Sequence, residues 1–322
     1  MKVFDPQYRP KSFCREFVDV KGTAIQLGMI MSTVLGIKPL MDDWIPANKI
    51  DDYKAVCKSY GLKLREDVIF LTVAKNQLQS DIVGRECLTT TLAYALPIEK
   101  DIIGLIHVFI SKSEKMLEKG MWYPVIIKDR VIFSPIADLL RYGYVLGYPD
   151  CCIRFFRTYN NWNRYSHLYE IYINTKSRPS FLCNPLMKDT SFSYIYHMPC
   201  SFSCAQTMST VSRLRQEIKK REPGYVALTD RYLKMPFLVF YEKKYYCFEG
   251  ALKGNEIKYK NCHSLFSDPS LDIYDDDFKK ADTLRLEGRR IILSRRNRAF
   301  RQINVVCDKF APEHPFLIQF KG

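Results

Sequence analysis

Two cysteine motifs constrain the fold of this chain more than any other feature of its sequence. The first is GYPDCC, residues 147–152, in which Pro149 starts a predicted helix that continues as DCCIRFFRTYNN. The second is HMPCSFSC, residues 197–204, which opens a predicted helix that runs as far as the Pro-Gly pair at 223–224. A long connection rich in proline and serine separates them. If both motifs serve one site, the fold must bring two distant helix starts together.

The position of the cysteines at helix starts favours metal binding. A helix N-terminus carries partial positive charge, and it can lower a thiol pKa from about 8.5 into a range of roughly 3.5–7.5. The spacing of Cys200 and Cys204 predicts that both lie on one helix face, with Cβ atoms about 5–6 Å apart. Adjacent helical residues point in different directions, so we expect only one of Cys151 and Cys152 to join them. The sequence does not say which one.

Three kinds of chemistry suit these residues. Three thiolates with an open position are typical of a 4Fe–4S cluster that binds a substrate at one iron; Cys152, Cys200 and Cys204 would hold it, and Cys151 and His197 would act beside it as catalytic groups. Three cysteines with His197, or all four cysteines, would equally suit tetrahedral zinc. Thiol catalysis by Cys151 or Cys200 with His197 as the base is the third alternative. Spacing alone does not choose among them.

The remaining cysteines and histidines carry weaker signals. Free cysteine is among the most buried residue types, so the cysteines scattered singly in predicted elements are expected to be core residues: Cys14, Cys57, Cys87, Cys247 and Cys307. Cys183 and Cys262 stay undecided. His107, in an apolar strand, is expected to be a satisfied core residue, and His263 beside Cys262 is not assigned to the site.

The two motifs together resemble those of a prokaryotic family of uncharacterised proteins, whose members carry GYPxCC and HxPCSxxC. Both motifs are complete here: Gly147, Tyr148, Pro149, Cys151 and Cys152 match the first, and His197, Pro199, Cys200, Ser201 and Cys204 match the second. The resemblance covers about the middle third of the chain. It implies a shared site and carries no activity with it.

Alternation of helical and strand patterns predicts an α+β fold in three parts. Residues 1–130 are expected to form an N-terminal α/β layer, with strands at DVIFLTVA and DIIGLIHVFIS and a helix at SDIVGRECLTTTLAYAL capped by Ser80. Residues 131–235 form a helical cysteine-bearing region. Residues 236–322 form a small antiparallel sheet, with turns at Lys253-Gly254-Asn255 and Glu287-Gly288.

Charge and hydropathy narrow the setting and the partners. No apolar stretch is long enough for a membrane span of about 20 residues, and the N-terminus does not resemble a secretory signal. We therefore expect a cytoplasmic protein with reduced thiols and no membrane association. A formal net charge of +14 and the Arg-rich segment from Arg285 to Arg301, expected to be a β-hairpin, favour an acidic partner such as nucleic acid. A solvated basic face explains the same charge, and the oligomeric state stays open.

The function that these patterns favour is that of a metalloenzyme. Its cofactor would be a cysteine-ligated iron–sulfur cluster with an open coordination site, and it would act as a transferase or lyase on RNA or a small molecule. Walker-type phosphate loops, GxGxxG, CxxxCxxC, HExxH and GxSxG are all missing from the sequence, which disfavours the common nucleotide-dependent, radical and serine-hydrolase enzymes. The alternative is a zinc-stabilised protein that binds nucleic acid and has no catalytic role.

Overall fold

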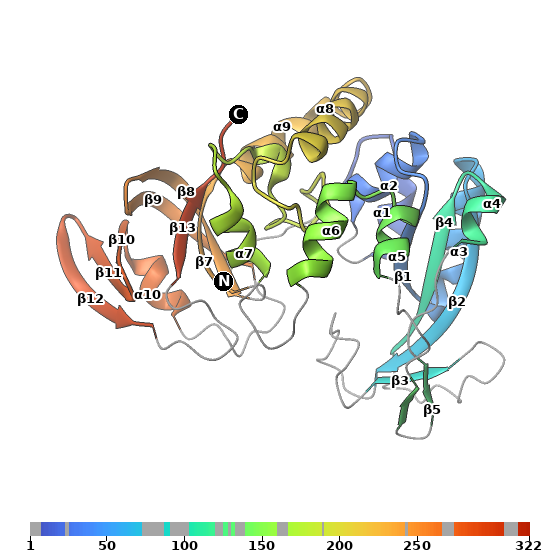
Figure 1. Ribbon diagram of the computed structural model, residues 1–322, viewed down its shortest axis with the longest axis horizontal. Coiled ribbons are helices and arrows are strands. Elements are labelled where there is room, and N and C mark those ends of the chain that lie inside the picture. The colour runs from blue at the N-terminus through green and yellow to red at the C-terminus, as the bar shows by residue number, and fades with distance from the viewer. Residues whose placement is uncertain are drawn as a thin grey trace. The chain divides into compact units, whose positions relative to one another are not determined.

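The computed structural model of the chain is shown in Figure 1. It describes residues 8–22, 26–72, 87–90, 103–119, 125–127, 130–132, 139–159, 167–188, 190–241, 244–265, 274–305 and 315–322. These residues form two compact units. The N-terminal unit contains residues 9–153 with 220–222, and the C-terminal unit contains residues 154–219 and 223–322 with Tyr8.

The N-terminal unit is built on an antiparallel sheet with the strand order β1-β4-β2-β3, accompanied by a separate two-stranded hairpin of β5 and β6. Its elements, in chain order, are α1 (Arg15–Lys21), α2 (Leu27–Val34), β1 (Met41–Pro46), the short 3-10 helix η1 (Ala47–Lys49), α3 (Ile50–Ser59), β2 (Lys63–Thr72), β3 (Cys87–Thr90), β4 (Ile103–Ser111), α4 (Glu114–Leu117), β5 (Val125–Ile127), β6 (Arg130–Ile132) and α5 (Leu139–Val145). Helix α6 (Asp150–Tyr159) begins in this unit.

Strand β1 has two chemically different faces. Buried residues alternate with half-buried ones along it, as the period of a strand requires. Asp43 lies on the buried face, where Lys21 Nζ donates to its carboxylate at 2.5 Å and the Tyr53 hydroxyl donates at 3.3 Å. Asp42 lies on the opposite face, which includes the imidazole of His107. A buried charge needs such partners. Asp43 therefore connects β1 to α1 and α3, and Asp42 connects it to β4.

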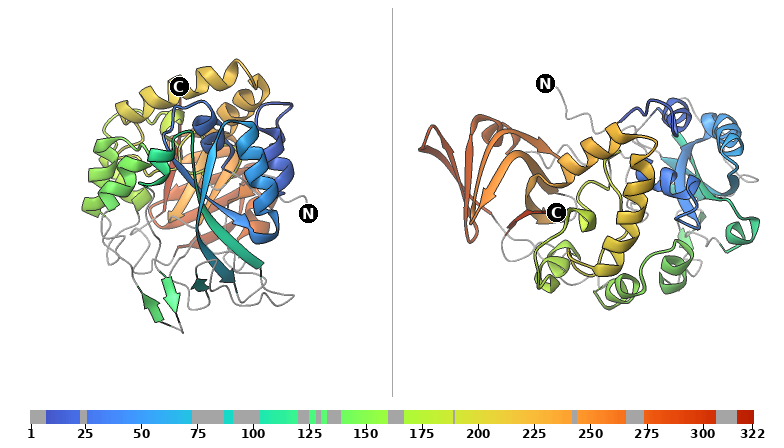
Figure 2. Two further views of the ribbon diagram at one scale, coloured as in Figure 1. Left: turned by 90° about the vertical axis from the view of Figure 1, so that its right-hand side faces the viewer. Right: turned by 90° about the horizontal axis from the view of Figure 1, so that it is seen from above.

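The C-terminal unit combines helices with a seven-stranded antiparallel sheet of order β12-β11-β10-β9-β8-β7-β13, seen in the second view of Figure 2. After α6 its elements are α7 (His167–Asn174), η3 (Phe181–Cys183), α8 (Ala205–Lys219), α9 (Pro223–Leu233), β7 (Pro236–Tyr241), β8 (Lys244–Lys253), β9 (Glu256–Ser264), α10 (Asp275–Lys280), β10 (Thr283–Glu287), β11 (Arg290–Arg295), β12 (Arg298–Asn304) and β13 (Phe316–Gln319).

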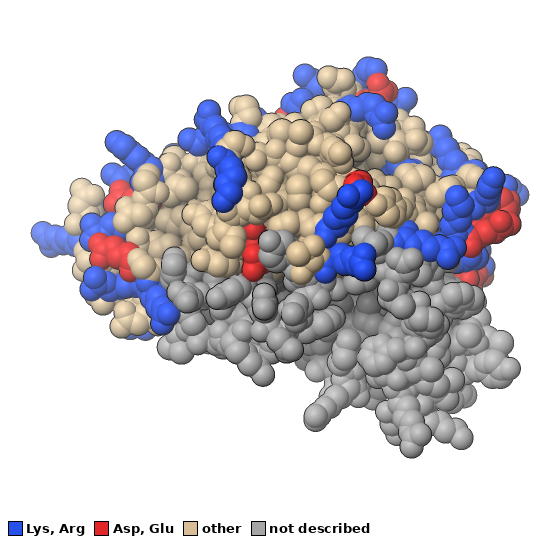
Figure 3. Space-filling model, in the orientation of Figure 1, with Lys and Arg blue, Asp and Glu red and all other residues tan. Residues whose placement is uncertain are grey.

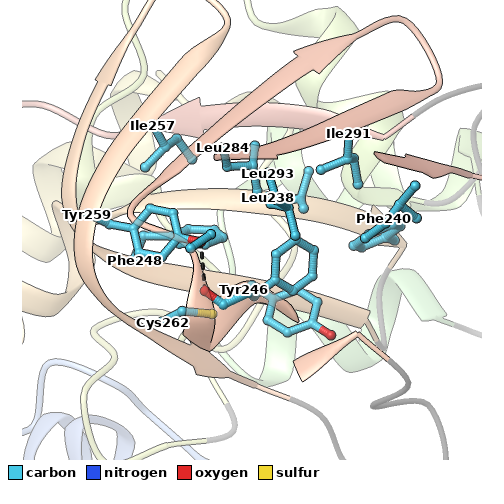
Figure 4. Close-up of a cluster of buried hydrophobic side chains, with 13 residues drawn as sticks. Leu238, Phe240, Tyr246, Phe248, Ile257, Tyr259, Cys262, Leu284, Ile291 and Leu293 are labelled. Atoms are coloured by element: carbon cyan, nitrogen blue, oxygen red, sulfur yellow. Dashed lines mark hydrogen bonds between the residues drawn. The ribbon is translucent and has the colours of Figure 1, made fainter. Parts of the chain in front are cut away.

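One face of this sheet carries the core shown in Figure 4. Residues such as Phe248, Leu284 and Leu293 are fully buried, and Phe278 of α10 packs among them. The Tyr259 hydroxyl donates to the Phe278 carbonyl at 2.7 Å, which satisfies the polar end of a buried ring. Alternation of apolar and polar residues places the other side chains of β9 to β11 on the opposite face.

Tight turns set the register of the hairpins in this sheet. Gly254 and Gly288 have positive φ values of 61° and 59°, as two-residue hairpin loops require. The predicted turns at these two positions are therefore confirmed. The Arg-rich segment contains more than the single hairpin expected, because a further turn at Arg296 and Asn297, both with positive φ, adds β12 to β11.

The predicted fold class, α+β with an N-terminal α/β layer, a helical cysteine-bearing region and a small C-terminal antiparallel sheet, is confirmed. The boundaries proposed at residues 130 and 235 stay predictions. The expected helix over 80–96 is wrong at Cys87–Thr90, which forms β3 paired with β2. Its other residues lie outside the described part of the chain. None of the helices formed by described residues is both long and apolar enough to span a membrane.

Candidate metal centre

The glycine of GYPDCC ends helix α5 in a Schellman turn. Gly147 adopts the left-handed conformation with φ 73°. Its backbone N–H donates to the Tyr144 carbonyl at 3.0 Å, and the Tyr148 N–H donates to the Gly143 carbonyl at 2.9 Å. These two bonds satisfy carbonyl groups that a helix end leaves without partners. The first half of the motif thus ends one helix and leads directly into the next.

Pro149 then caps helix α6, and the cysteines follow in its first turn. The Pro149 carbonyl accepts from the backbone N–H groups of Cys152 and Ile153, at 2.9 and 3.0 Å. Asp150 is the first helical residue, where a carboxylate is favourable. Cys151 and Cys152 therefore occupy the second and third helical positions, in the first turn of α6. Cys151 is half-buried and Cys152 is buried.

The second motif differs from its prediction. Cys200 and Cys204 do not lie on one helix face, because α8 begins only at Ala205. Residues 200–204 form a turn, in which the Cys204 N–H donates to the Ser201 carbonyl at 3.2 Å. Cys204 is the residue that caps α8, and its carbonyl accepts from the Met208 N–H at 2.9 Å. Serine favours such turns and caps over helix interiors, which is why the helix starts later than its pattern suggested.

A buried phenylalanine anchors the turn between these two cysteines. Phe202 is fully buried, and its ring centroid lies 5.1 Å from that of Phe320. Its N–H donates to Thr175 Oγ1 at 2.9 Å, and its carbonyl accepts from the Ser180 N–H at 2.8 Å. The Asn174 side chain donates to the Cys200 carbonyl at 2.6 Å. Phe202 was not expected to belong to the site, although an apolar residue between two serines inside a cysteine motif is a signal for such an anchor.

All four motif cysteines meet at one place. The Sγ atoms of Cys151, Cys152, Cys200 and Cys204 lie within 4.8 Å of one another, close enough to hold a metal ion. The prediction that Cys152, Cys200 and Cys204 converge is therefore confirmed. The expectation that only one of the adjacent cysteines joins Cys200 and Cys204 is wrong, since the Cys151 and Cys152 sulfurs are 3.9 Å apart and both belong to the group. Cys151 and Cys200 are half-buried, whereas Cys152 and Cys204 are buried.

His197 lies beside helix α8, outside the group of four sulfurs. Its Nε2 is 3.1 Å from the hydroxyl oxygen of Thr207, a fully buried residue in the first turn of α8. The imidazole is half-buried. Its proposed role as a catalytic acid or base stays a prediction, as does that of Cys151.

Other cysteines among the described residues follow the expectation of buried thiols. Cys14, Cys57 and Cys247 are buried, and burial raises the pKa of each, that of Cys57 to about 12. These groups stay protonated at neutral pH and are poor metal ligands. Cys183 is also buried and donates its S–H to the Cys204 carbonyl at 3.5 Å. The expected burial of Cys87 and Cys307 stays a prediction, because neither side chain belongs to the described part of the structure.

His107 and His263, which were not assigned to the cysteine site, each lie beside a carboxylate. His107 is fully buried, and its Nε2 lies 3.4 Å from an oxygen of Asp42, as expected for a satisfied core residue. His263 lies with its Nε2 3.2 Å from Glu249 Oε1 in the C-terminal sheet. Cys262 is buried in the core of that sheet. None of these three belongs to the group of four sulfurs.

The chain was compared with known proteins at three levels. No protein-family model matches it, and neither a curated protein nor a solved structure is significantly similar to it. The four-cysteine cluster is accordingly the feature from which its function can be inferred.

Proposed function

We propose that this protein binds one zinc ion through the thiolates of Cys151, Cys152, Cys200 and Cys204. The observation that carries the proposal is the mutual distance of the four sulfurs, all within 4.8 Å. A Zn–S bond of about 2.3 Å in a tetrahedron places the ligand sulfurs about 3.8 Å apart. The 3.9 Å between the sulfurs of Cys151 and Cys152 is close to that value.

The same distances favour one ion over a cubic iron–sulfur cluster. In a 4Fe–4S cluster each cysteine binds a different iron at a different corner, so the four cysteine sulfurs stand farther apart than ligands of a single ion. An open coordination site would also require one of the four thiols to stay out of the cluster. Here all four sulfurs belong to one group, which supports a closed tetrahedral centre.

Local electrostatics favours the thiolate form of three of the four ligands. Cys151 and Cys152 lie in the first turn of α6, and Cys204 caps α8, so three of the four thiols are at the positive ends of helices. Four thiolates and one Zn²⁺ leave a net charge of −2, which these helix ends partly offset. A centre of this kind contributes to folding stability, and catalysis is not needed to account for it.

Metal analysis of protein purified without oxygen tests the proposal. We expect colourless protein with one zinc per chain. The half-buried ligands give the mildest variants, so Cys151→Ser and Cys200→Ser should each lose most of the zinc. Cys183→Ser is the matched control, because Cys183 is a buried thiol near the motif but outside the group, and this variant should keep the metal.

Two results would overturn the proposal. One is a brown protein containing iron and acid-labile sulfide, which would favour the iron–sulfur enzyme. The other is full zinc content in Cys151→Ser and Cys200→Ser, which would place the ion elsewhere. If His197→Ala were also free of metal, the histidine would belong to the ligand set.

A second property, nucleic-acid binding, is favoured by the polar face of the C-terminal sheet. Strand register puts Lys258 and Arg285 on the same face, and Lys260 and Arg290 follow at positions of the same parity. All four side chains are exposed. Two carboxylates offset part of this charge, since Glu287 pairs with both Arg285 and Arg290, and Glu256 lies 3.8 Å from Lys258. Figure 3 shows basic side chains interspersed with acidic ones at the left of the molecule, where β10, β11 and β12 lie in Figure 1.

Salt dependence distinguishes such a surface from an ordinary solvated face. We propose that it contacts the phosphate backbone, in which case affinity for a nucleic acid falls steeply with salt because counterions are released. The double variant Lys258→Glu, Lys260→Glu should bind more weakly, whereas Lys63→Glu, an exposed site in the N-terminal unit, should not. Equal affinity of the double variant and the wild type, or no binding at low salt, would argue against the proposal.

A further inference from the structure

One lysine far from the cysteine motifs in sequence holds the turn that precedes Cys151. Lys38 Nζ donates to the Leu146 carbonyl at 2.5 Å, at the end of helix α5. The same nitrogen lies 4.3 Å from the centroid of the Tyr148 ring. Lys38 therefore contacts both residues that flank the glycine of GYPDCC. The Lys38 side chain thus provides a hydrogen-bond donor for one of the carbonyl groups that the end of the helix leaves without a backbone partner.

The neighbouring proline closes against the glycine itself. A Cβ atom added at Gly147 would lie 2.6 Å from Pro39 Cδ, closer than such atoms approach in proteins. The positive φ of Gly147 separately disfavours any other residue. Residues 38 and 39 thus form a surface that fits the turn closely. The Pro39 carbonyl is in turn held by Ser111 Oγ, which donates to it at 2.6 Å.

Asp42, four residues beyond Lys38, ties the same segment to helix α5. The Tyr142 hydroxyl donates to Asp42 Oδ2 at 2.6 Å, and His107 Nε2 is 3.4 Å from that oxygen. Partners around Asp42 lower the pKa of its carboxyl group despite its burial, His107 and then Tyr142 being the main ones. The segment 38–42 therefore contacts both β4 and the α5 region at each of its ends.

We propose that Lys38 is a positioning residue of the metal centre, holding the turn that directs Cys151 and Cys152 toward the ion. The inference rests on the proposed zinc site. The physical route is short: Lys38 fixes the Leu146 carbonyl, the Schellman turn fixes Pro149, and Pro149 caps the helix that carries the two ligands. Groups that orient metal ligands without touching the metal commonly change affinity by about 10–100-fold when they are replaced.

The test uses the full chain with three variants. Lys38→Met keeps the aliphatic contact and removes the donor, and Lys38→Arg keeps a cationic donor. Lys63→Met removes an exposed lysine that pairs with Glu114 and serves as the control. In competition with a zinc chelator we expect Lys38→Met to bind zinc about 10–100-fold more weakly. Lys38→Arg should recover most of the affinity, and Lys63→Met should match the wild type.

Hydrogen exchange of the metal-free protein separates this inference from the zinc proposal. In Lys38→Met the amides of Gly147 and Tyr148 should exchange faster, while those of β4 should be unchanged. If the wild type bound no zinc but Lys38→Met still showed this local change, Lys38 would position the turn and the zinc assignment alone would fail. Wild-type zinc affinity in Lys38→Met, or unchanged exchange at both amides, would overturn the inference. If Lys38→Met does not fold, Lys38→Gln, whose shorter amide cannot reach the carbonyl, carries the same expectations.

Discussion

The sulfur atoms of Cys151 and Cys152 lie 3.9 Å apart, although the two residues are neighbours on helix α6. Inside a helix, adjacent side chains diverge by about 100° and cannot converge on one atom. At the second and third helical positions no preceding turn is present, and Cα–Cβ bonds tilt toward the N-terminus. Both sulfurs can therefore approach a point beyond the helix end, which is the place where a metal would gain most from the helix dipole.

The stability of the turn at residues 200–204 should depend on Phe202. We expect Phe202→Ala to lower the free energy of unfolding by about 3–5 kcal/mol, because it leaves a cavity at a fully buried site. Urea unfolding monitored by circular dichroism measures the change. Phe300→Ala is the control, since Phe300 is 46% exposed and its loss should have little effect. Similar midpoints for the two variants would show that Phe202 does not anchor the turn.

A buried carboxylate should stabilise the start of the N-terminal unit. Glu222 is 2% exposed and accepts from the backbone N–H groups of Lys11, Ser12 and Phe13, at 3.3, 2.8 and 3.0 Å. Glu222→Ala removes the acceptor of these donors, at a cost of about 1–3 kcal/mol. The midpoint of thermal unfolding should be lower for Glu222→Ala than for Glu114→Ala, in which an exposed carboxylate is removed. An unchanged midpoint would mean that water replaces the carboxylate without loss.

Lys38 should make stability depend on pH in the neutral to alkaline range. Burial lowers the pKa of its amine from 10.5 to about 7, against the opposing effect of Asp42. Between these two values the unfolded chain holds a proton that the folded chain has released, so stability should rise with pH from about 7 toward 10.5. Denaturant unfolding at several pH values measures the slope. Lys38→Met should show a shallower rise than Lys63→Met, and equal slopes would contradict the assignment.

Metal should protect the half-buried cysteines from alkylation. In metal-free folded protein, iodoacetamide should modify Cys151 and Cys200 first, because these two thiols are the more accessible members of the group. Added zinc should slow their modification. Cys14, Cys57 and Cys247 should react slowly in both states, since they are buried and their thiol pKa is raised. Peptide mass spectrometry gives the order, and modification of Cys151 at the same rate with and without zinc would exclude it as a ligand.

Local features of the fold followed from local sequence. Glycines at 254 and 288 predicted their hairpin turns because only a few residue types tolerate positive φ, and Pro149 predicted the start of α6 because its ring suits a helix N-terminus. The two cysteine motifs predicted a shared site because each supplies two thiols and thiolates are common metal ligands. The exact start of α8 did not follow, since serines can cap a helix as well as enter it.

Tertiary structure decided the rest of the site. That the sulfurs of both Cys151 and Cys152 reach the group depends on which way the first turn of α6 points. The turn before that helix is contacted by Lys38 and Pro39, more than a hundred residues away in sequence. Phe202 became an anchor only through its contact with Phe320. Periodicity and turn chemistry report the backbone conformation of neighbouring residues, whereas the convergence of four sulfurs from two motifs is a property of packing between distant segments.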